Sequence, residues 1–424
     1  MPIVGQIERI TQNRVIKLLK EKLDFEYLGD WKERENNSNI EVDILRNWLK
    51  NSQGYSEVLI DKSIAQLSKI AKDQQSNLYE VNKNVYQELR YGSKVTEDTG
   101  ANRKTVWFID WNDPNNNHFS FAQEVTFHGP NTKRPDIVIY VNGIAIGVLE
   151  LKRSTTSVVE GIRQNITNQK KTFIQSFFTT VQFVLAGNDT EGLRYGTTET
   201  PEGYYLDWKE ESDIENHLDR SLLQMLDKNR LIDLMYNFIA FDKGIKKVCR
   251  PNQYFGVKSA QDYIRSDTGG ILWHTQGSGK SLTMVWLSKW ILENVDNSRV
   301  LIITDRKELD EQIEKVFGGV SESIKRAGNS KKLIESLNAS APRLICSLVH
   351  KFGRSVPNGV NEYTDELLNG LPADFTPKGK IYIFVDECHR TQSGKLHHAM
   401  KTLLGNSIIT VSYTHLTLPT TPYV

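Results

Sequence analysis

The chain has 424 residues and a net charge of +1, with 38% hydrophobic and 25% charged residues. This length exceeds the usual size of one domain and predicts two or three, and the composition excludes a disordered or membrane-embedded chain. The near-neutral charge excludes a histone-like binder of nucleic acid, so any DNA contact must use local patches.

The cysteine content indicates a reducing environment. Cys249, Cys346 and Cys388 are the three cysteines, and their odd number and wide spacing fit neither a disulfide framework nor a zinc site. The N-terminus has no secretory signal pattern, and no apolar run reaches the length of a membrane span. We therefore expect a soluble, cytoplasmic protein.

The first part of the chain alternates between helical and strand-like patterns. Apolar residues recur at helical spacing over 7–23 and 57–73, which predicts two amphipathic helices. Strand-like runs at 105–109 and 120–127 flank the turn-forming segment 112–117, and this pattern predicts a hairpin between the two runs.

A second hairpin pattern follows, with apolar runs at 137–141 and 144–151 around an Asn-Gly pair. A helical pattern over 158–178 and an apolar strand at 181–186 complete a predicted ββαβ unit.

The segment 213–240 is helical in pattern, and we place a domain boundary near Arg230. Beyond it, strand-like runs alternate with helical ones, which predicts a parallel sheet covered by helices. The predicted strands lie at 270–273, 300–304, 344–347 and 381–385. The expected fold is thus α/β throughout, with a mixed sheet first and a doubly wound parallel sheet second.

A glycine-rich motif follows the predicted strand at 270–273 and opens a helix near Leu282. Such a loop cradles phosphates with backbone N–H groups at a helix N-terminus. Lys280 would reach the β and γ phosphates of ATP, and Ser281 would ligate Mg²⁺. The expected nucleotide contacts are Thr275, Gln276, Gly277, Ser278, Gly279, Lys280 and Ser281. An ordinary glycine-rich surface turn is the plain alternative.

His274 stands where the strict phosphate-loop pattern has glycine, and the motif instead resembles motif I of superfamily 2 helicases. Acidic residues after the strand 381–385 would complete such an ATP site. Asp386 would hold Mg²⁺, and Glu387 would polarise the attacking water. The sequence Asp-Glu-Cys-His at 386–389 is similar to the helicase DEAD box, in which His389 would couple the nucleotide to the motor.

Further residues are assigned by the same resemblance. Gln253 looks like the residue that reads adenine in these motors. The strand ends after 300–304 and 344–347 correspond to motifs that touch the DNA backbone, although each is also an ordinary strand-to-helix loop. The expected DNA contacts are Thr304, Arg306, Ser347 and His350.

A second site is expected on the hairpin at 137–151. Asp136 precedes its first strand, and Glu150 and Lys152 end its second. Two carboxylates bind Mg²⁺ through hard oxygen ligands, and a neighbouring lysine can orient or deprotonate a water molecule, which suits phosphodiester hydrolysis. Gln164 on the following helix is a further candidate. A chance match of these residue types is the alternative.

The register of the hairpin tests this site. In a strict two-residue Asn142-Gly143 turn, Asp136 pairs with Leu149 and lies on the opposite face from Glu150. The nuclease interpretation therefore predicts a longer connection or a β-bulge somewhere in the hairpin.

A P-D…E-x-K nuclease motif followed by a superfamily 2 motor resembles the R subunit of type I restriction enzymes over nearly the whole chain. The resemblance implies ATP, Mg²⁺, double-stranded DNA, and partner M (methyltransferase) and S (specificity) subunits, and it suggests that Glu8 assists the metal site. The family commonly has Gln-x-x-x-Tyr after the lysine, and here Gln164 fits but Asn168 stands in the tyrosine position.

We expect a nuclease domain with a helical linker at 1–230, a first RecA-like lobe at 231–411, and a tail of non-native sequence at 412–424. A motor of this class completes its ATP site with a second lobe, so the chain alone is expected to lack ATPase turnover. Two alternatives stay open. One is a stand-alone translocase or helicase with an inert N-terminal platform, and the other is an inactive nucleotide-binding fragment.

Overall fold

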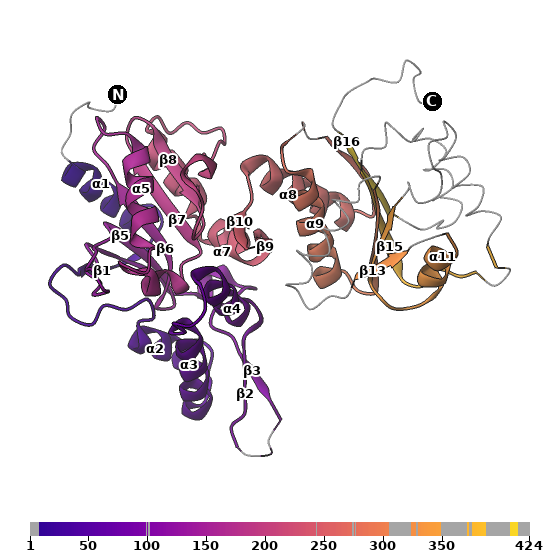
Figure 1. The fold of residues 1–424 in the computed structure, drawn as a ribbon, viewed down its shortest axis with the longest axis horizontal. Helices are drawn as coiled ribbons and strands as arrows, with labels where there is room; N and C mark the ends of the chain where they lie inside the picture. The colour runs from indigo at the N-terminus through magenta and orange to yellow at the C-terminus, as the bar shows by residue number, and fades with distance from the viewer. Residues whose placement is uncertain are drawn as a thin grey trace. The chain divides into compact units, whose positions relative to one another are not determined.

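The computed structural model describes residues 8–98, 100, 102–242, 244–273, 275, 277–304, 324–327, 330–348, 371–372, 375–386 and 408–413. The chain forms two compact units, Met1–Arg250 and Pro251–Val424, coloured from indigo to pink and from salmon to yellow in Figure 1. The division falls after Arg250, whereas the sequence pattern suggested one near Arg230. Among the described helices, none is long and apolar enough to cross a membrane.

The first unit is built on a mixed sheet of six strands in the order β1-β4-β5-β6-β7-β8. Strand pairs β1–β4 and β6–β7 are parallel, and the other pairs are antiparallel. The strands are β1 (Glu26–Asp30), β4 (Phe119–Gln123), β5 (Ile137–Val141), β6 (Ile144–Leu151), β7 (Phe183–Asn188) and β8 (Gly192–Gly196).

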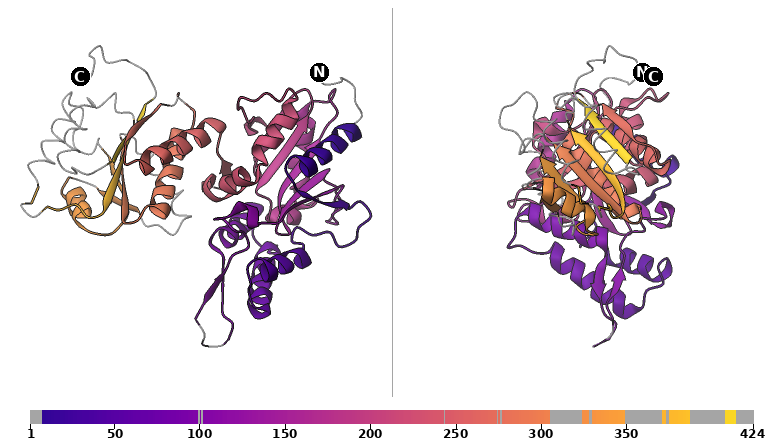
Figure 2. Two further views of the ribbon diagram at one scale, coloured as in Figure 1. Left: turned by 180° about the vertical axis from the view of Figure 1, so that it is seen from behind. Right: turned by 90° about the vertical axis from the view of Figure 1, so that its right-hand side faces the viewer.

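Helices flank this sheet, and α5 connects the parallel strands β6 and β7 (Figures 1 and 2). The α-helices are α1 (Glu8–Glu21), α2 (Val42–Asn51), α3 (Glu57–Ala71), α4 (Leu78–Tyr91), α5 (Val158–Asn168), α6 (His217–Met225) and α7 (Lys228–Asn237). Short 3-10 turns occur at η1 (Pro114–Asn116), η2 (Gln175–Thr179) and η3 (Glu202–Tyr204).

Two small antiparallel ladders complete the first unit. One pairs β2 (Ser93–Val95) with β3 (Lys104–Val106), and the other pairs β9 (Ile239–Asp242) with β10 (Ile245–Val248). The predicted hairpin between 105–109 and 120–127 is therefore wrong, because β3 pairs with β2 while β4 pairs with β1 and β5. The helices expected over 7–23 and 57–73 and the ββαβ unit are confirmed.

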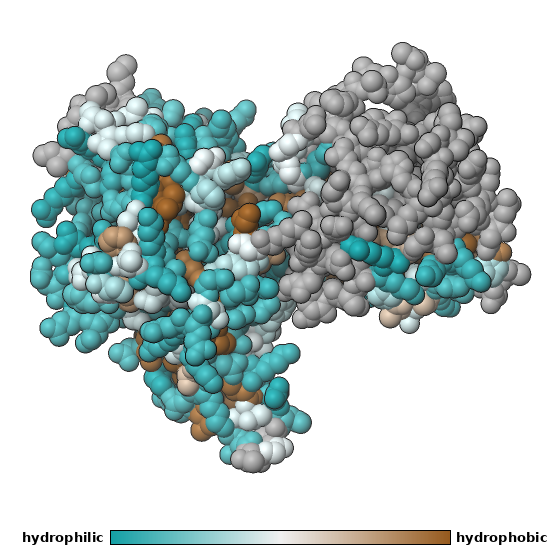
Figure 3. Space-filling view, in the orientation of Figure 1, coloured by the Kyte–Doolittle hydropathy of each residue, from teal (hydrophilic) through white to brown (hydrophobic). Residues whose placement is uncertain are grey.

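The central strands β5 and β6 are buried on both faces of the sheet, and one face carries a large hydrophobic cluster. Buried side chains from β5, β6 and β7 pack there against aromatic residues of η2, and the cluster includes Val138, Tyr140, Val148, Val184, Phe177 and Phe178. The face of this unit that is visible in Figure 3 is predominantly hydrophilic, with hydrophobic residues scattered over it.

The second unit contains a six-stranded parallel sheet in the order β11-β16-β15-β12-β14-β13. The strands are β11 (Gly270–Trp273), β12 (Ser298–Thr304), β13 (Ile324–Ala327), β14 (Leu344–Leu348), β15 (Lys380–Asp386) and β16 (Ile408–Tyr413). Helices α8 (Pro251–Arg265) and α9 (Lys280–Asn294) cover one face, and α11 (Ser330–Asn338) lies on the other (Figures 1 and 2). The predicted parallel, helix-covered sheet is confirmed.

Of the tail expected at 412–424, Ser412 and Tyr413 continue β16. The remaining residues, 414–424, lie outside the described part of the chain.

Candidate functional sites

The hairpin β5–β6 presents the carboxylates of the expected nuclease site. Its turn is the two-residue Asn142-Gly143 connection, in which both residues have positive φ, 52° and 80°. This combination defines the type I′ turn that matches the twist of a hairpin. A side chain at Gly143 would also collide with the Glu41 carbonyl oxygen, since a Cβ there would lie 2.7 Å from it.

The register of the hairpin shifts once, and this shift decides the geometry of the site. Val141 lies opposite Ile144 and Ile137 lies opposite Leu149, with an irregularity between Ile139 and Tyr140. Ile146 is the extra residue on β6. Continuing this register by one residue brings Asp136 opposite Glu150, on the same face of the sheet. The predicted bulge is confirmed.

The two carboxylates lie side by side and differ in their partners. Asp136 Oδ2 accepts a hydrogen bond of 2.7 Å from the backbone N–H of Leu151. Glu150 is completely buried. Its Oε1 accepts a bond of 3.4 Å from the side-chain amide of Asn168, and its Oε2 has no partner in the structure.

Burial disfavours the charged forms of both carboxyls. It raises the pKa of Asp136 to about 6, and the neighbouring Lys152 ammonium opposes the rise. Burial raises the pKa of Glu150 well above its ordinary range, and the Asp136 carboxylate raises it further. In the absence of a cation, burial therefore disfavours the doubly charged form of the pair.

Lys152 completes the group. Its ammonium lies 3.3 Å from Glu8 Oε1 and donates a 2.9 Å hydrogen bond to the Leu151 carbonyl oxygen. Its backbone N–H donates to the Gly187 carbonyl oxygen of β7, which fixes the end of β6. The structure thus brings Glu8, Asp136, Glu150 and Lys152 together.

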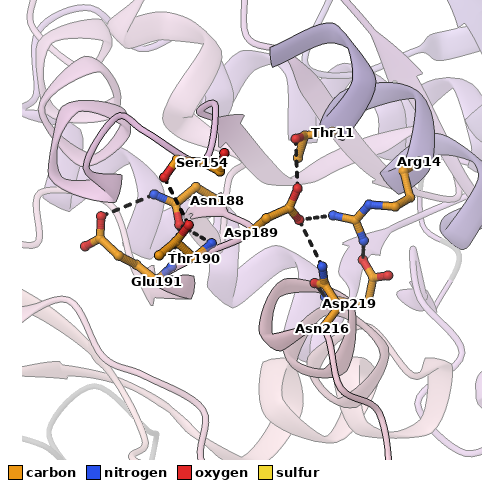
Figure 4. A network of polar contacts seen from close by, with 9 residues as sticks. All are labelled: Thr11, Arg14, Ser154, Asn188, Asp189, Thr190, Glu191, Asn216 and Asp219. Atoms are coloured by element: carbon orange, nitrogen blue, oxygen red, sulfur yellow. Dashed lines mark hydrogen bonds and ion pairs between the residues drawn. The ribbon is translucent and has the colours of Figure 1, made fainter. Parts of the chain in front are cut away.

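A polar network ties α1, which carries Glu8, to the end of β7 (Figure 4). The buried Asp189 carboxylate accepts a 3.1 Å bond from Thr11 and forms an ion pair with Arg14, which also pairs with Asp219. Asn216 donates to the same Asp189 carboxylate. These bonds hold α1 where Glu8 meets Lys152.

The loop after Lys152 is held in the same region. Asn188 donates a 2.8 Å hydrogen bond to the Thr156 carbonyl oxygen, and Thr190 donates to the Ser154 carbonyl oxygen. Glu191 accepts a bond from the Val158 N–H at the start of α5. These bonds therefore fix the loop after Lys152 and the start of α5 to the end of β7.

On α5 the structure places Asn168, rather than Gln164, against Glu150. Gln164 is half-buried, and no hydrogen bond of its side chain occurs among the described residues. Gly161 and Asn168 stand seven positions apart, so both lie on the sheet-facing side of the helix. A Cβ at Gly161 would lie 3.6 Å from that of Glu150. The contact between Asn168 and Glu150 was not predicted from the sequence, because the family motif has its glutamine at position 164.

The described residues contain no cluster of three His, Cys, Asp or Glu side chains that could alone hold a metal ion. The site offers two carboxylates, one of which has an unpartnered buried oxygen. That donor set fits Mg²⁺, which is often bound by one or two carboxylates and completed by water and substrate phosphate.

In the second unit, the expected phosphate loop joins β11 to α9. Gly277 and Gly279 have φ of 77° and 86°, a conformation that favours glycine. Ser278 donates through its N–H and its hydroxyl to the Thr275 carbonyl oxygen. Gly279 is the N-cap residue of α9, and Lys280 begins the helix. The loop thus leads directly into a helix N-terminus, where anions are favoured.

Gln253, expected to read adenine, lies on α8 against this loop. Its side chain is buried and donates a 2.8 Å hydrogen bond to the Gly279 carbonyl oxygen. A Cβ at residue 279 would collide with the Gln253 amide. The backbone conformation with positive φ favours glycine at this position, and a Cβ there would require the Gln253 amide to move.

The parallel strands bring the other motor candidates to the same edge of the sheet. Asp386 ends β15, next to Ser412 of β16, and Thr304 ends β12. The side chains of Thr304 and Ser347 are buried, which is not the position expected of residues that touch DNA. The candidates Gln276, Arg306, His350, Glu387 and His389 lie outside the described residues.

Two family models match the chain. Residues 6–203 match the N terminus of the type I restriction enzyme R protein, and residues 252–417 match the SWI2/SNF2 ATPase. Their border agrees with the division of the structure after Arg250.

Curated relatives agree with both matches. The chain is 27% identical over 364 residues to a chain named as the type I restriction enzyme MjaIXP endonuclease subunit of Methanocaldococcus jannaschii, covering 76% of this chain and 34% of the relative. It is 25% identical over 306 residues to the type I restriction enzyme SsaAORF53P endonuclease subunit of Staphylococcus saprophyticus, covering 71% of this chain and 32% of the relative. The chain thus spans about a third of the length of these relatives.

Among solved structures, the UvsW helicase from bacteriophage T4 aligns with 44% of this chain and 59% of its own at 17% identity. The TM-score is 0.27, and we draw nothing from this overlap.

A mixed sheet bearing paired carboxylates, followed by a parallel-sheet lobe with a phosphate loop, defines a nuclease-type domain joined to a RecA-like ATPase lobe. The two family matches cover most of the chain in that order. The chain is therefore similar to the R proteins of type I restriction enzymes over most of its length.

Proposed function

We propose that the first unit cleaves DNA with Mg²⁺ bound by Asp136 and Glu150. The observation that carries this proposal is the bulge at Ile146, because it brings both carboxylates to one face. A buried hairpin gains nothing from two adjacent acids, which cost free energy unless they are paired or bound to a metal ion.

The bound cation would supply charge for the phosphate oxygens and lower the pKa of a water molecule. The residues of the chain do the rest. Asp136, which is held by the Leu151 N–H, and Glu150 would hold the cation. The Lys152 ammonium, oriented by the Leu151 carbonyl oxygen, would donate a hydrogen bond to the attacking water and so position it. Glu8 holds this ammonium at the site.

For the second unit, we propose ATP binding at the loop of residues 275–281, with Ser281 and Asp386 holding Mg²⁺. Gln253 stays a proposed adenine contact, and its bond to Gly279 supports a place beside the nucleotide. Glu387 is the proposed residue that polarises the attacking water, and His389 the proposed coupling residue. A second lobe in a longer protein would complete the motor.

The whole protein would then act as the restriction subunit of a type I system. It would move along double-stranded DNA at the expense of ATP and cut it away from the recognition site, with M and S subunits choosing the sequence. The similarity to restriction endonuclease subunits supports this proposal.

The test uses the full-length protein with its co-encoded M and S subunits. We expect ATP-dependent cleavage of unmethylated DNA by the wild type, and Asp136→Ala should abolish cutting while ATP hydrolysis continues. Lys280→Ala should abolish both. Unchanged cutting by Asp136→Ala would refute the nuclease site. A wild type that hydrolyses ATP with DNA but never cuts would support the stand-alone translocase instead.

A further inference from the structure

The sheet-facing side of α5 carries two buried asparagines with different partners. Asn165 donates a 2.8 Å hydrogen bond to the Leu185 carbonyl oxygen and so attaches the helix to β7. Asn168, one turn later, donates to Glu150 Oε1 at 3.4 Å. One asparagine therefore holds the helix to the backbone, while the other holds a side chain of the proposed nuclease site.

The contact of Asn168 divides the two oxygens of Glu150 between two roles. Oε1 is occupied by the amide, and Oε2 has no partner. Glu150 is completely buried, so this oxygen is enclosed by the protein. Glu150 Oε2 is thus available to a cation that also contacts Asp136.

Asn168 itself has an unpartnered group at the same place. Its side chain is 1% exposed, and its Oδ1 makes no hydrogen bond in the structure. Buried acceptors without partners are uncommon in folded proteins, and the Oδ1 of Asn165 is a second one on this helix. What distinguishes Asn168 is that its side chain contacts Glu150. A water molecule on the bound cation would supply the hydrogen that Oδ1 lacks.

We propose that Asn168 is a positioning residue of the nuclease site, which holds Glu150 so that its Oε2 faces the cation. This inference rests on the proposed nuclease function. A donor on one oxygen of a carboxylate fixes its orientation and leaves the other oxygen for the metal ion, as hydrogen bonds to metal ligands commonly do. Residues that orient metal ligands in this way typically contribute about 10- to 100-fold to metal affinity.

The experiment measures Mn²⁺ binding to the 424-residue chain by titration calorimetry without nucleotide, at several pH values. The binding signal removed by Asp136→Ala defines the site. Asn168→Ala should weaken that binding about tenfold or more and move its onset to higher pH, because Glu150 loses a donor to its ionised form. Asn165→Ala is the matched control. It removes an equally buried amide from the same helix, and it should lower the melting temperature but leave Mn²⁺ affinity unchanged.

Asn168→Leu fills the space without a donor and replaces Asn168→Ala if that variant does not fold. Unchanged Mn²⁺ affinity and pH onset in the folded Asn168 variant would overturn the inference while leaving the metal site in place. An equal loss of affinity in Asn165→Ala would also overturn it, since the effect would then be one of general stability. If the wild type and Asp136→Ala bind Mn²⁺ alike, the proposed nuclease site fails, and this inference fails with it.

Discussion

At the scale of residues, the proposed nuclease site places two acids where the fold disfavours their charge. Asp136 is half-buried and Glu150 fully buried. The Asp136 carboxylate raises the cost of ionising Glu150, and Glu8 and Glu124 raise that of ionising Asp136. Lys152 offsets part of this cost, but its ammonium is shared with Glu8. Such an arrangement lowers the free energy of unfolding when no ligand is bound, and cation binding raises it again.

The residue types and their spacing were sufficient to predict that Asp136, Glu150 and Lys152 lie together, because a hairpin of this length leaves few geometries once a bulge is required. The role of Asn168 was not predictable in the same way. Whether Gln164 or Asn168 meets Glu150 depends on the rotation of α5 over the sheet, which Gly161 sets by close packing. The sequence does not specify that packing.

The raised pKa of Asp136 makes the stability of the metal-free protein depend on pH. The folded form binds the proton with a pKa of about 6, against 3.8 for the ordinary group, so raising the pH from about 4 to 6 removes a proton that the folded state holds more tightly. Stability should therefore fall across that interval, by up to about 3 kcal/mol for this group.

Asp136→Asn removes this titration while keeping an oxygen for the Leu151 N–H. In urea unfolding with a chelator present, the variant should gain stability over the wild type between pH 4 and 6 and keep a constant advantage above pH 7. Addition of Mn²⁺ at pH 7.5 should stabilise only the wild type. An advantage that is the same at every pH would contradict the assigned cause.

At the scale of elements, strands were easier to predict than their partners. The apolar runs at 105–109 and 120–127 indicated strand structure, and proximity along the chain suggested that they pair. In the structure β4 is hydrogen-bonded to β1 on one edge and to β5 on the other, and β3 pairs with β2. Alternation of apolar residues reports burial of a face, and it does not identify the neighbouring strand.

The close approach of α5 to β6 supports a prediction about Gly161. A Cβ at this position would lie 3.2 Å from the Ala186 Cβ and 3.5 Å from Lys152 Cγ. Gly161→Ala requires a shift of a few tenths of an ångström, and the higher helix propensity of alanine offsets it by up to about 1 kcal/mol. We expect near-normal stability and Mn²⁺ binding.

Gly161→Leu should displace the helix, and with it Asn168 and Lys152. The variant is expected to lose about tenfold or more in Mn²⁺ affinity, measured by the same calorimetry, while ATP binding to the second unit is unchanged. Normal Mn²⁺ binding by the leucine variant would show that α5 does not set the geometry of the site.

At the scale of the whole molecule, the chain consists of two units with separate cores, and the helical pattern at 213–240 concealed the border between them. That segment forms α6 and α7, which are followed by the ladder β9–β10, and all of these elements belong to the first unit. The sequence pattern marks where helices lie, but it does not show which core they cover.

The ladder β9–β10 is attached to the first unit by buried polar contacts. The ammonium of Lys246 is enclosed by neutral oxygens, at 2.8 Å from Asn82 Oδ1 and 2.7 Å from Gln182 Oε1, and its burial holds its pKa well below the ordinary range. The Tyr195 hydroxyl donates a 2.9 Å bond to the Cys249 carbonyl oxygen. Removing this ladder would leave these acceptors and the hydroxyl buried without partners.

Two fragments test the border directly. Residues 1–250 should fold alone, with a cooperative urea transition and the Mn²⁺ affinity of the longer chain. Residues 1–230 lose the ladder and part of α7, and each buried polar group left without a partner costs about 1–3 kcal/mol. Since domains are stable by only about 5–15 kcal/mol, we expect the shorter fragment to be aggregated or to show a broad transition at much lower urea. Equal stability of the two fragments would place the border near Arg230 and would show that the ladder β9–β10 is a linker rather than part of the first unit. A fold in 1–250 without Mn²⁺ binding would instead mean that the nuclease site needs residues of the second unit.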